Sequence, residues 1–481
     1  MALLDLPADI ILSVLSHCSV SDVISTAMTC RHLHALGFEK SVWLILLTDL
    51  KRRGFLDETH TAVLQDLTTQ ELVNLVKRVV LGPESWWPDE HGVVKPRVAR
   101  EIVLHPTNVS ERNQLVDGGR YLLTHGAATI ECWDVVTDTL FWRLPEPPSE
   151  DDSQIGDFAA EFRDEDQSLV IMIHRECTVA PEHSIEVIQV DFRTEIHASL
   201  LQVRLQKEVY YEIWGLVICG DLCVFSGYGR YTYVIFDWRN QCWLELSNVP
   251  LDDYAHGCPF TLELADDNAF LIVGDDTANE LRIVHNAALR ARLRPISTLS
   301  PPPFVLVSDI HPLLTHAFPS TVIQVRFEND FLRPVHELSV CKSPLAMDTY
   351  RVWVYITKSY YLPPVSPQES YGKEQRYSPS LLCGFTFSRH GDILRWRETS
   401  PPCVAPANLV THLRRIAFSG HRCVRGEDTA LEEHIVPPTA CLPGLPNNLP
   451  IEYWCPILTT YSGALSFVSK SDSEIMVQYF Q

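Results

Sequence analysis

The sequence predicts a multidomain α + all-β protein, with a short helical region first and a long β region after it. Two observations carry this prediction. Apolar residues repeat with the period of an α-helix up to about residue 81, and with the period of a β-strand from about residue 97. The length of 481 residues also allows about three average domains, or fewer if one is a large all-β domain. We therefore expect a small helical domain at 1–50, a linker helix and connection at 51–96 and a β domain at 97–481.

Composition excludes several classes of protein. The chain has 39 basic and 61 acidic residues and a formal net charge of −22, so its surface repels phosphate backbones and disfavours nucleic-acid binding. Acidic residues at positions 5 and 9 argue against a signal peptide, and no apolar run approaches the roughly 18 residues of a membrane span. We expect an intracellular protein, cytoplasmic or nuclear, that binds neither nucleic acid nor membrane.

The fourteen cysteines include no C-x-x-C pair. The closest two, Cys219 and Cys223, flank the turn "CGDLC" and could face each other across a hairpin. A reduced, buried pair is the commoner arrangement in an intracellular protein.

A helical hairpin is predicted at the N-terminus. Pro7 suits the start of a helix, and Asp9 complements its positive end. The motif "SVSD" at 19–22 has capping-box spacing and predicts the start of a second helix. The apolar residues on the two faces are Ile10, Ile11, Val14, Leu15 and Cys18 in the first helix and Val23, Ala27, Cys30 and Leu33 in the second. Leu12, Ile24 and Met28 lie off these faces, so the apolar surface exceeds what two small helices can bury against each other.

The stretch "LPADIILSVLSHCSVSDVISTAMTCRHLHAL", followed by Trp43, resembles an F-box. The Leu-Pro start, the Ile-Ile pair, the Asp that opens the second helix, the Cys-Arg after it and the final Trp match that family's pattern in order. The resemblance implies docking on a Skp-type adaptor, which connects the protein to a cullin–RING ubiquitin ligase. An ordinary helical hairpin packed on its own C-terminal domain is the alternative.

The resemblance also implies which side chains lie in or directly beneath the adaptor interface. They are Leu6, Pro7, Ile10, Ile11, Leu15, Val23, Cys30 and Trp43. Thr29 stands where the family pattern usually has an apolar residue, so we expect slightly weaker packing there.

One amphipathic helix is predicted in the linker. In "LTTQELVNLVKRVV", Thr68 and Glu71 have capping-box spacing and apolar residues follow with a helical period, until Gly82 and Pro83 end the helix. In F-box proteins such a segment joins the adaptor-binding unit to the substrate domain.

The β region contains a repeat. "RYLLTHGAATIECWDVVTDTLFWRL" predicts three short strands, and "HSIEVIQVDFRTEIHASL" and "YTYVIFDWRNQCWLEL" repeat the order of strand, Asp, polar turn and strand. Asp134, Asp191 and Asp237 are separated by 57 and 46 residues, and His285 in "NELRIVHNAALRARL" takes the Asp position 48 residues further on. Repeats of this length indicate a β-propeller or another closed array of four-stranded sheets, and we expect a propeller of about seven blades. "CWD" at 132–134 is similar to the WD-repeat signature, but only once.

The ends of the β region predict how the ring closes. "GALSFVSKSDSEIMVQYF" is a hairpin, and "RVAREIVLHP" near residue 100 supplies the strand beside it. "STLSPPPF", "YLPPVSPQESYGKEQRYSPS" and "TSPPCVAPAN" are rich in proline, which predicts loops.

Chemistry-bearing motifs are missing from the sequence. It has no phosphate-binding glycine loop, no serine-hydrolase elbow and no zinc-protease motif, and the acidic runs lack calcium-loop spacing. We therefore expect no enzyme, no cofactor and no metal. The leading hypothesis is the substrate-recognition subunit of a Skp–cullin–F-box type ubiquitin ligase that binds a protein substrate through its propeller. The alternatives are a propeller enzyme or ligand-binding protein with a chance F-box-like N-terminus, and an F-box–adaptor scaffold outside any ligase.

Overall fold

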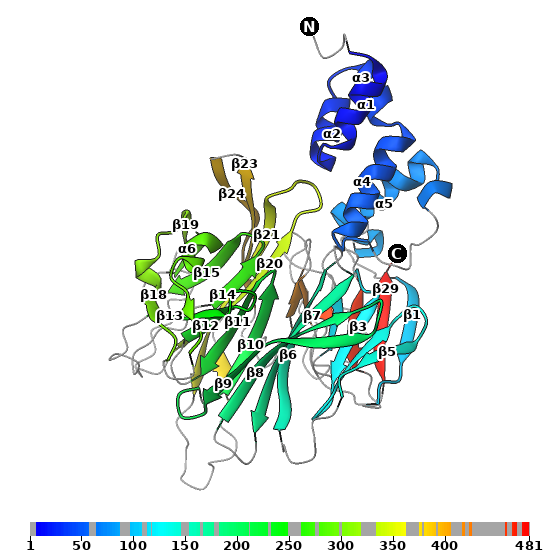
Figure 1. Cartoon of the computed structure of the whole chain (residues 1–481). Helices are drawn as coiled ribbons and strands as arrows, with labels where there is room; N and C mark the ends of the chain where they lie inside the picture. Colours follow the sequence, from blue (N-terminus) through cyan, green and yellow to red (C-terminus); the bar gives the residue numbers. More distant parts are fainter. Residues whose placement is uncertain are drawn as a thin grey trace.

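The structure of the chain is a computed structural model (Figure 1). It describes residues 6–56, 64–86, 97–107, 113–116, 118–145, 153–163, 167–177, 182–210, 212–228, 232–248, 261–274, 279–297, 301–318, 333–361, 375–377, 380–390, 393–405, 416–418, 423–425, 457–458, 464–468 and 474–480.

The N-terminal region is helical and shares one core. Its α-helices are α1 (Ala8–Ser16), α2 (Val20–Ala27), α3 (Arg31–Gly37), α4 (Lys40–Arg52) and α5 (Thr69–Leu81), with 3₁₀ turns at Leu64–Asp66 and Glu84–Trp86. Side chains from all five helices pack in a single apolar cluster that includes Leu47 and Leu72, both wholly buried. The unit predicted at 1–50 and the linker helix are therefore continuous in packing, and we call 6–86 the helical unit.

Both predicted capping boxes are confirmed. Ser19 and Asp22 cap α2, and Thr68 and Glu71 cap α5. The backbone N–H and the hydroxyl of Thr68 both donate to the Glu71 carboxylate at 2.7 Å, which lowers the pKa of Glu71.

The predicted second helix is wrong in its length, because two helices occupy that segment. α2 ends at Ala27, and Cys30 has extended backbone (φ −157°, ψ 163°) immediately before α3. The Thr29 hydroxyl donates to the Thr26 carbonyl at 2.7 Å. This local bond competes with continued helix.

Most of the remaining described residues form seven sheets, which are antiparallel except for the parallel pairing of residues 304–306 with the third sheet. In chain order their strands are, first sheet, β2 (Asn113–Val116), β3 (Tyr121–His125), β4 (Ile130–Asp134) and β5 (Thr139–Arg143); second, β6 (Ser153–Arg163), β7 (Ser168–Cys177), β8 (Glu182–Asp191) and β9 (Ile196–Gln206); third, β10 (Glu212–Cys219), β11 (Leu222–Tyr228), β12 (Thr232–Asp237) and β13 (Cys242–Ser247); fourth, β14 (Thr261–Ala265), β15 (Asn268–Gly274), β16 (Asn279–His285) and β19 (Leu314–Phe318); fifth, β20 (Arg333–Lys342), β21 (Thr349–Tyr361), β23 (Ser380–His390) and β24 (Ile393–Ala405), with β22 (Gln375–Tyr377) beside β21; sixth, β25 (Ile416–Phe418) and β26 (Cys423–Arg425); and last, β27 (Ile457–Leu458), β28 (Leu465–Val468), β29 (Ile475–Phe480) and β1 (Val98–Leu104).

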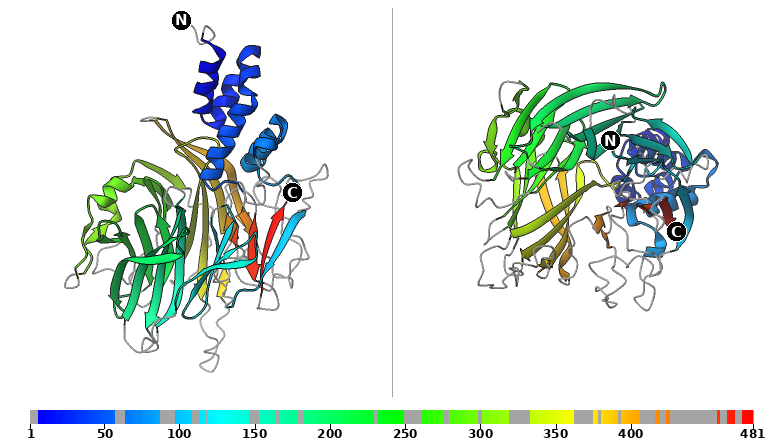
Figure 2. Two further views of the ribbon diagram at one scale, coloured as in Figure 1. Left: turned by 45° about the vertical axis from the view of Figure 1, so that its right-hand side comes forward. Right: turned by 90° about the horizontal axis from the view of Figure 1, so that it is seen from below.

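The sheets are arranged around a centre (Figure 2). The first strand of each sheet contacts that of the next along the series β27, β2, β6, β10, β14 and β20, and β25 contacts β27. Separate apolar clusters fill the spaces between neighbouring sheets. This is the architecture of a β-propeller, as the sequence predicted. The number of blades remains the prediction of about seven.

The repeated aspartates end the third strand of each of the first three sheets, as predicted. Asp134, Asp191 and Asp237 each accept a backbone N–H from two or three residues further on, at 2.7–3.0 Å. His285 takes this place in the fourth sheet, where its Nδ1 accepts the N–H of Ala287 at 3.0 Å. The four positions therefore have one role, which is to start a turn.

The segment after His285 corrects the sequence prediction of another strand. Helix α6 (Asn286–Arg290) follows, and the fourth strand of that sheet, β19, comes later in the chain. The earlier turns contain a residue with positive φ, at Asp138, Glu195 and Gln241. "NAALR" has two alanines instead, which favour helix. The chain then adds β17 (Arg294–Pro295) and β18 (Phe304–Leu306) beside β13.

One proline-rich loop prediction is also wrong. In "TSPPCVAPAN" the residues up to Ala405 belong to β24, at the outer edge of the fifth sheet. The register shifts there, with Ser400 opposite Gly384 and Cys403 opposite Leu382. A bulge on an edge strand is a place where a sheet tolerates proline. Residues 362–374 of the longest proline-rich segment lie outside the described residues.

The two nearest cysteines do not face each other. Cys219 pairs with Leu222, Cys223 pairs with Ile218, and both thiols are free. They pack in clusters on opposite faces of the third sheet. Burial raises the pKa of both thiols, that of Cys219 to about 12. The register excludes the cross-hairpin pair that the sequence left open.

Ring closure follows the predicted pairing. β28 and β29 form the C-terminal hairpin, and β1 pairs antiparallel with β29, with Ile102 opposite Val477. The chain therefore enters the propeller as the outer strand of the sheet in which it ends.

Val477→Asp tests this closure. Val477 is wholly buried between the last and the first sheet, so an unpaired carboxylate there should cost at least about 3 kcal/mol of unfolding free energy. Arg100→Asp on the exposed start of β1 is the control, with an expected change within about 0.5 kcal/mol. Urea unfolding of both variants makes the measurement, and equal stability of the two would show that the last sheet is an appendage.

Candidate functional site

The helical unit lies on the face of the propeller that carries the turns between first and second strands (Figure 1). Arg53 Nη2 donates to the Ser343 carbonyl at 2.7 Å, and the Ser21 N–H donates to the Leu345 carbonyl at 3.1 Å. Both acceptors belong to the turn from β20 to β21. Arg78 donates to the carbonyl of Phe480 at the end of β29.

Apolar packing strengthens this attachment. Cys341, at the end of β20, is buried inside the core cluster of the helical unit, and burial raises the pKa of its thiol to about 12. At the turn from β2 to β3, Gly118 approaches Leu56 so closely that a Cβ at Gly118 would be 2.1 Å from the Leu56 carbonyl oxygen. The helical unit is thus held by the first, fifth and last sheets.

Packing on the propeller leaves a set of large apolar side chains on the helices exposed. Their exposed fractions are 46% for Ile10, 49% for Val14, 38% for Ile24, 81% for Met28, 38% for Phe38 and 48% for Ile45. Ile10 and Val14 are one helical turn apart on α1, and Ile24 on α2 is one turn before Met28, the residue that caps the C-terminus of α2, so each pair shares a face. The sequence alternative of a hairpin packed on its own C-terminal domain therefore describes only part of the apolar surface.

The predicted interface residues lie at two depths. Ile11, Leu15, Val23 and Trp43 are at most 2% exposed and form the core of the helical unit. Leu6 and Cys30 are half-buried against that core, whereas Pro7 and Ile10 are exposed.

Exposed apolar residues were missing from that predicted set. Val14, Ile24, Met28, Phe38 and Ile45 were not in it, although the position of Ile24 and Met28 off the buried helix faces was the available signal. Phe38 links the buried core to the surface, because its partly exposed ring stacks on His34 and contacts the buried Trp43. Thr29 is exposed, so it takes no part in the core of the helical unit, and weaker packing at that position stays a prediction for the adaptor interface.

The site has no reactive group of its own. Burial raises the pKa of the Cys18 thiol, and the Asp22 carboxylate adds to this shift. Within the described ranges, no three histidine, cysteine, aspartate or glutamate side chains gather as metal ligands. No described helix is long and apolar enough to span a membrane. What the surface presents is exposed apolar area.

The model of the F-box domain family matches residues 3–44, which covers α1 to α3 and the start of α4. The chain carries an F-box. The exposed side chains from Ile10 to Phe38 all lie within this F-box, and Ile45 directly follows it.

The comparison with curated proteins found no match. Among solved structures, the WD40 domain of SCAP from fission yeast is 8% identical, with a TM-score of 0.35 over 78% of this chain and 85% of that chain. The complex of the fission yeast SREBP–SCAP binding domains is 9% identical, with a TM-score of 0.31 over 60% of this chain and 63% of that chain. The propeller assignment rests on the strand pairing described above.

Gly118→Ala should loosen the helical unit from the propeller. The new Cβ would collide with Leu56, and φ is +62°. Gly220→Ala is a matched control in the equivalent turn of the third sheet, because φ is +59° there but no atom lies within 4 Å. Both variants carry the strain of a left-handed residue, about 1–2 kcal/mol. Only Gly118→Ala should also raise hydrogen exchange in α4 and α5. Equal exchange in the two variants would contradict a close fit at Leu56.

Proposed function

We propose that this protein is the substrate-recognition subunit of a Skp–cullin–F-box type ubiquitin ligase. The F-box binds the Skp-type adaptor, which connects it to the cullin and the RING protein, and the propeller binds a protein substrate. The observation that carries the proposal is the set of exposed apolar side chains on the F-box helices. The propeller leaves them uncovered, although it covers the ends of α2 and α4.

The energetics of these side chains suit a protein partner. Covering a fully exposed side chain of this type is worth about 1.5–3 kcal/mol, and a half-exposed one about half of that. A few central residues usually supply most of the binding energy of an interface. Val14 and Met28 are the most exposed of the set, at 49% and 81%. They are the candidates for that role.

The shared core favours a receptor that holds its partner in a fixed place. α5 and Cys341 belong to the same apolar cluster as the F-box helices, so no hinge separates the F-box from the propeller among the described residues. An adaptor bound to the F-box would keep a fixed orientation relative to the substrate domain. Ubiquitin transfer benefits from this, because the substrate is presented at a set distance from the ubiquitin donor. We propose a receptor rather than an enzyme.

A double variant, Val14→Asp with Met28→Asp, tests adaptor docking. Both side chains are exposed, so the fold should persist while adaptor affinity falls about 100-fold or more, since carboxylates would be buried unpaired in the interface. Ile196→Asp on β9 is the control, at an apolar position that is 67% exposed and outside the F-box. Titration calorimetry with a Skp-type adaptor gives the affinities. Adaptor binding by the double variant equal to that of the control would refute the docking surface.

The same double variant separates the ligase from its alternatives. Deleting 1–50 would strip α5 and Cys341 of their core, whereas the double variant leaves that core intact. Co-purification of cullin with the wild-type chain and its loss from the double variant would support the ligase. Adaptor without cullin would indicate a scaffold, and neither protein would indicate a propeller with another task.

A further inference from the structure

A row of exposed arginines lies on the outer part of the third and fourth sheets, in a chain whose net charge is −22. The segment from Asn286 to Ser297 contains Arg290, Arg292 and Arg294 and no acidic residue, and all three side chains are exposed. Arg239, in the turn from β12 to β13, is 60% exposed. We call these four residues the arginine rim.

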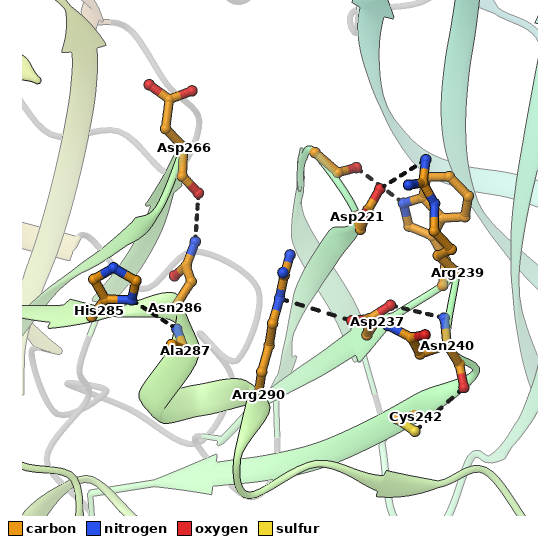
Figure 3. Close-up of polar contacts among 12 residues, drawn as sticks. Asp221, Asp237, Arg239, Asn240, Cys242, Asp266, His285, Asn286, Ala287 and Arg290 are labelled. Carbon is orange, nitrogen blue, oxygen red and sulfur yellow. Dashed lines mark hydrogen bonds and ion pairs between the residues drawn. The ribbon is translucent and has the colours of Figure 1, made fainter. Parts of the chain in front are cut away.

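Backbone pairing brings the two segments of the rim together. β17 lies beside β13, with Arg294 opposite Trp243, and the Ile296 N–H donates to the Gln241 carbonyl at 2.9 Å. α6 is tied to the same turn, because Arg290 Nε lies 3.8 Å from Asp237 Oδ2. Figure 3 shows Arg290 extending toward Asp237 and Arg239 extending toward Asp221. Residues more than fifty positions apart thus form one surface.

The rim arginines form a few contacts with neighbouring groups. These contacts orient the side chains and leave most of the guanidinium N–H donors available. Arg239 Nη2 lies 3.4 Å from Asp221 Oδ1, and Arg292 Nη2 donates to the Asp309 carbonyl at 3.2 Å. By contrast, Arg143 meets the wholly buried Glu131 at 2.6 Å. A guanidinium has five N–H donors in a fork that matches carboxylate and phosphate oxygens. The rim therefore presents several oriented donors to solvent.

The carboxylates near the rim do not cancel its charge. Asp221 is shared with a further arginine, Arg163, at 3.2 Å. Asp237 is buried and also accepts the N–H and the side-chain amide of Asn240. Asp309 is exposed at the edge. Asp266 and Asp267 lie at the other end of α6, where Lys342 contacts the Asp266 carboxylate. The four rim arginines therefore outnumber the two carboxylates with which they form ion pairs, Asp221 and Asp237, and leave a positive surface on a strongly negative protein.

We infer that the arginine rim binds an anionic segment of a protein, in which closely spaced carboxylate or phosphate groups meet the guanidinium forks. This rests on the proposed function, because it assigns a class to the substrate. Charge complementarity carries the assignment. The negative charge of the rest of the chain disfavours binding of an acidic segment elsewhere, so the rim would determine both the position and the orientation of the bound segment. Bidentate pairing at two or more arginines would fix its register.

The test uses the full-length chain bound to its adaptor and three fluorescein-labelled peptides of equal length, with repeats of glutamate–serine, phosphoserine–alanine and lysine–serine. The wild type should bind the first, the second or both, and should not bind the third. Arg290→Glu with Arg292→Glu and Arg294→Glu should weaken that binding about tenfold or more. The better of the two anionic peptides tells carboxylate recognition from phosphate recognition.

A second triple variant controls for charge alone. Arg97→Glu, Arg100→Glu and Arg204→Glu change the net charge equally at exposed positions away from the rim. It should weaken peptide binding by less than about twofold at physiological salt, where separated charges are screened. Equal losses from the two triple variants, or no preference of the wild type for an anionic peptide, would overturn the inference.

Single substitutions and adaptor affinity keep the test decisive. If the rim triple variant fails to fold, Arg292→Glu should still weaken binding several-fold, because its only described contact is with a backbone carbonyl. Adaptor affinity is measured on every sample and should not change in any rim variant. A rim variant that loses peptide binding but keeps adaptor binding would support the role of the rim. A wild-type chain that binds the peptide but no adaptor would contradict the proposed ligase and leave the rim's role intact.

Discussion

The pairing of β1 with β29 is the constraint on which the rest of the structure depends. A β-propeller is stabilised when its last sheet includes a strand from the start of the chain, because this pairing joins the two ends of the ring and covers a sheet edge that would otherwise be unpaired. Here the strand that completes the last sheet comes from residues 98–104, although its partners come from 465–480. The residues before β1 must therefore emerge beside the C-terminus. Arg78 of α5 reaches the carbonyl of Phe480 for this reason.

The position of the helical unit follows from the same closure. In antiparallel sheets of four strands, the first and third turns open on one face of the ring and the second turn on the other. β1 starts at a third turn, so the helices before it meet the face of first and third turns. There the turn at Gly118 and the turn at Ser343 each fit against them. The F-box is consequently fixed by ring geometry, and its apolar residues that face away from the propeller stay exposed.

Much of this arrangement could be predicted from the sequence, because it depends on local signals. The sequence correctly predicts the capping boxes at Ser19 and Thr68 and the aspartates that start turns. Each of these residues forms its hydrogen bonds with residues no more than three positions away in the chain. The break at Thr29 was missed, since a hydroxyl bond to Thr26 competes closely with another helical turn. The strand that includes Ser400 was missed as well, because an edge bulge tolerates prolines that normally predict a loop.

The functional surfaces were harder to predict because they depend on distant residues. Periodicity grouped Ile10 with Ile11, yet one is 46% exposed and the other 1%, and only the packing of α1 against α3 and α4 separates them. The arginine rim has the same origin. "ALRARLRP" looks like a continuation of the strand repeat, but α6 forms in its place and β17 joins the neighbouring sheet. The departure from the repeat at His285 thus places Arg294 on the edge of a different sheet, with Arg290 and Arg292 in and after α6, beside the turn that carries Arg239. Leu289 anchors α6 in the core between the third and fourth sheets, so the exposed arginines of this irregular segment can acquire a binding role without disturbing the ring.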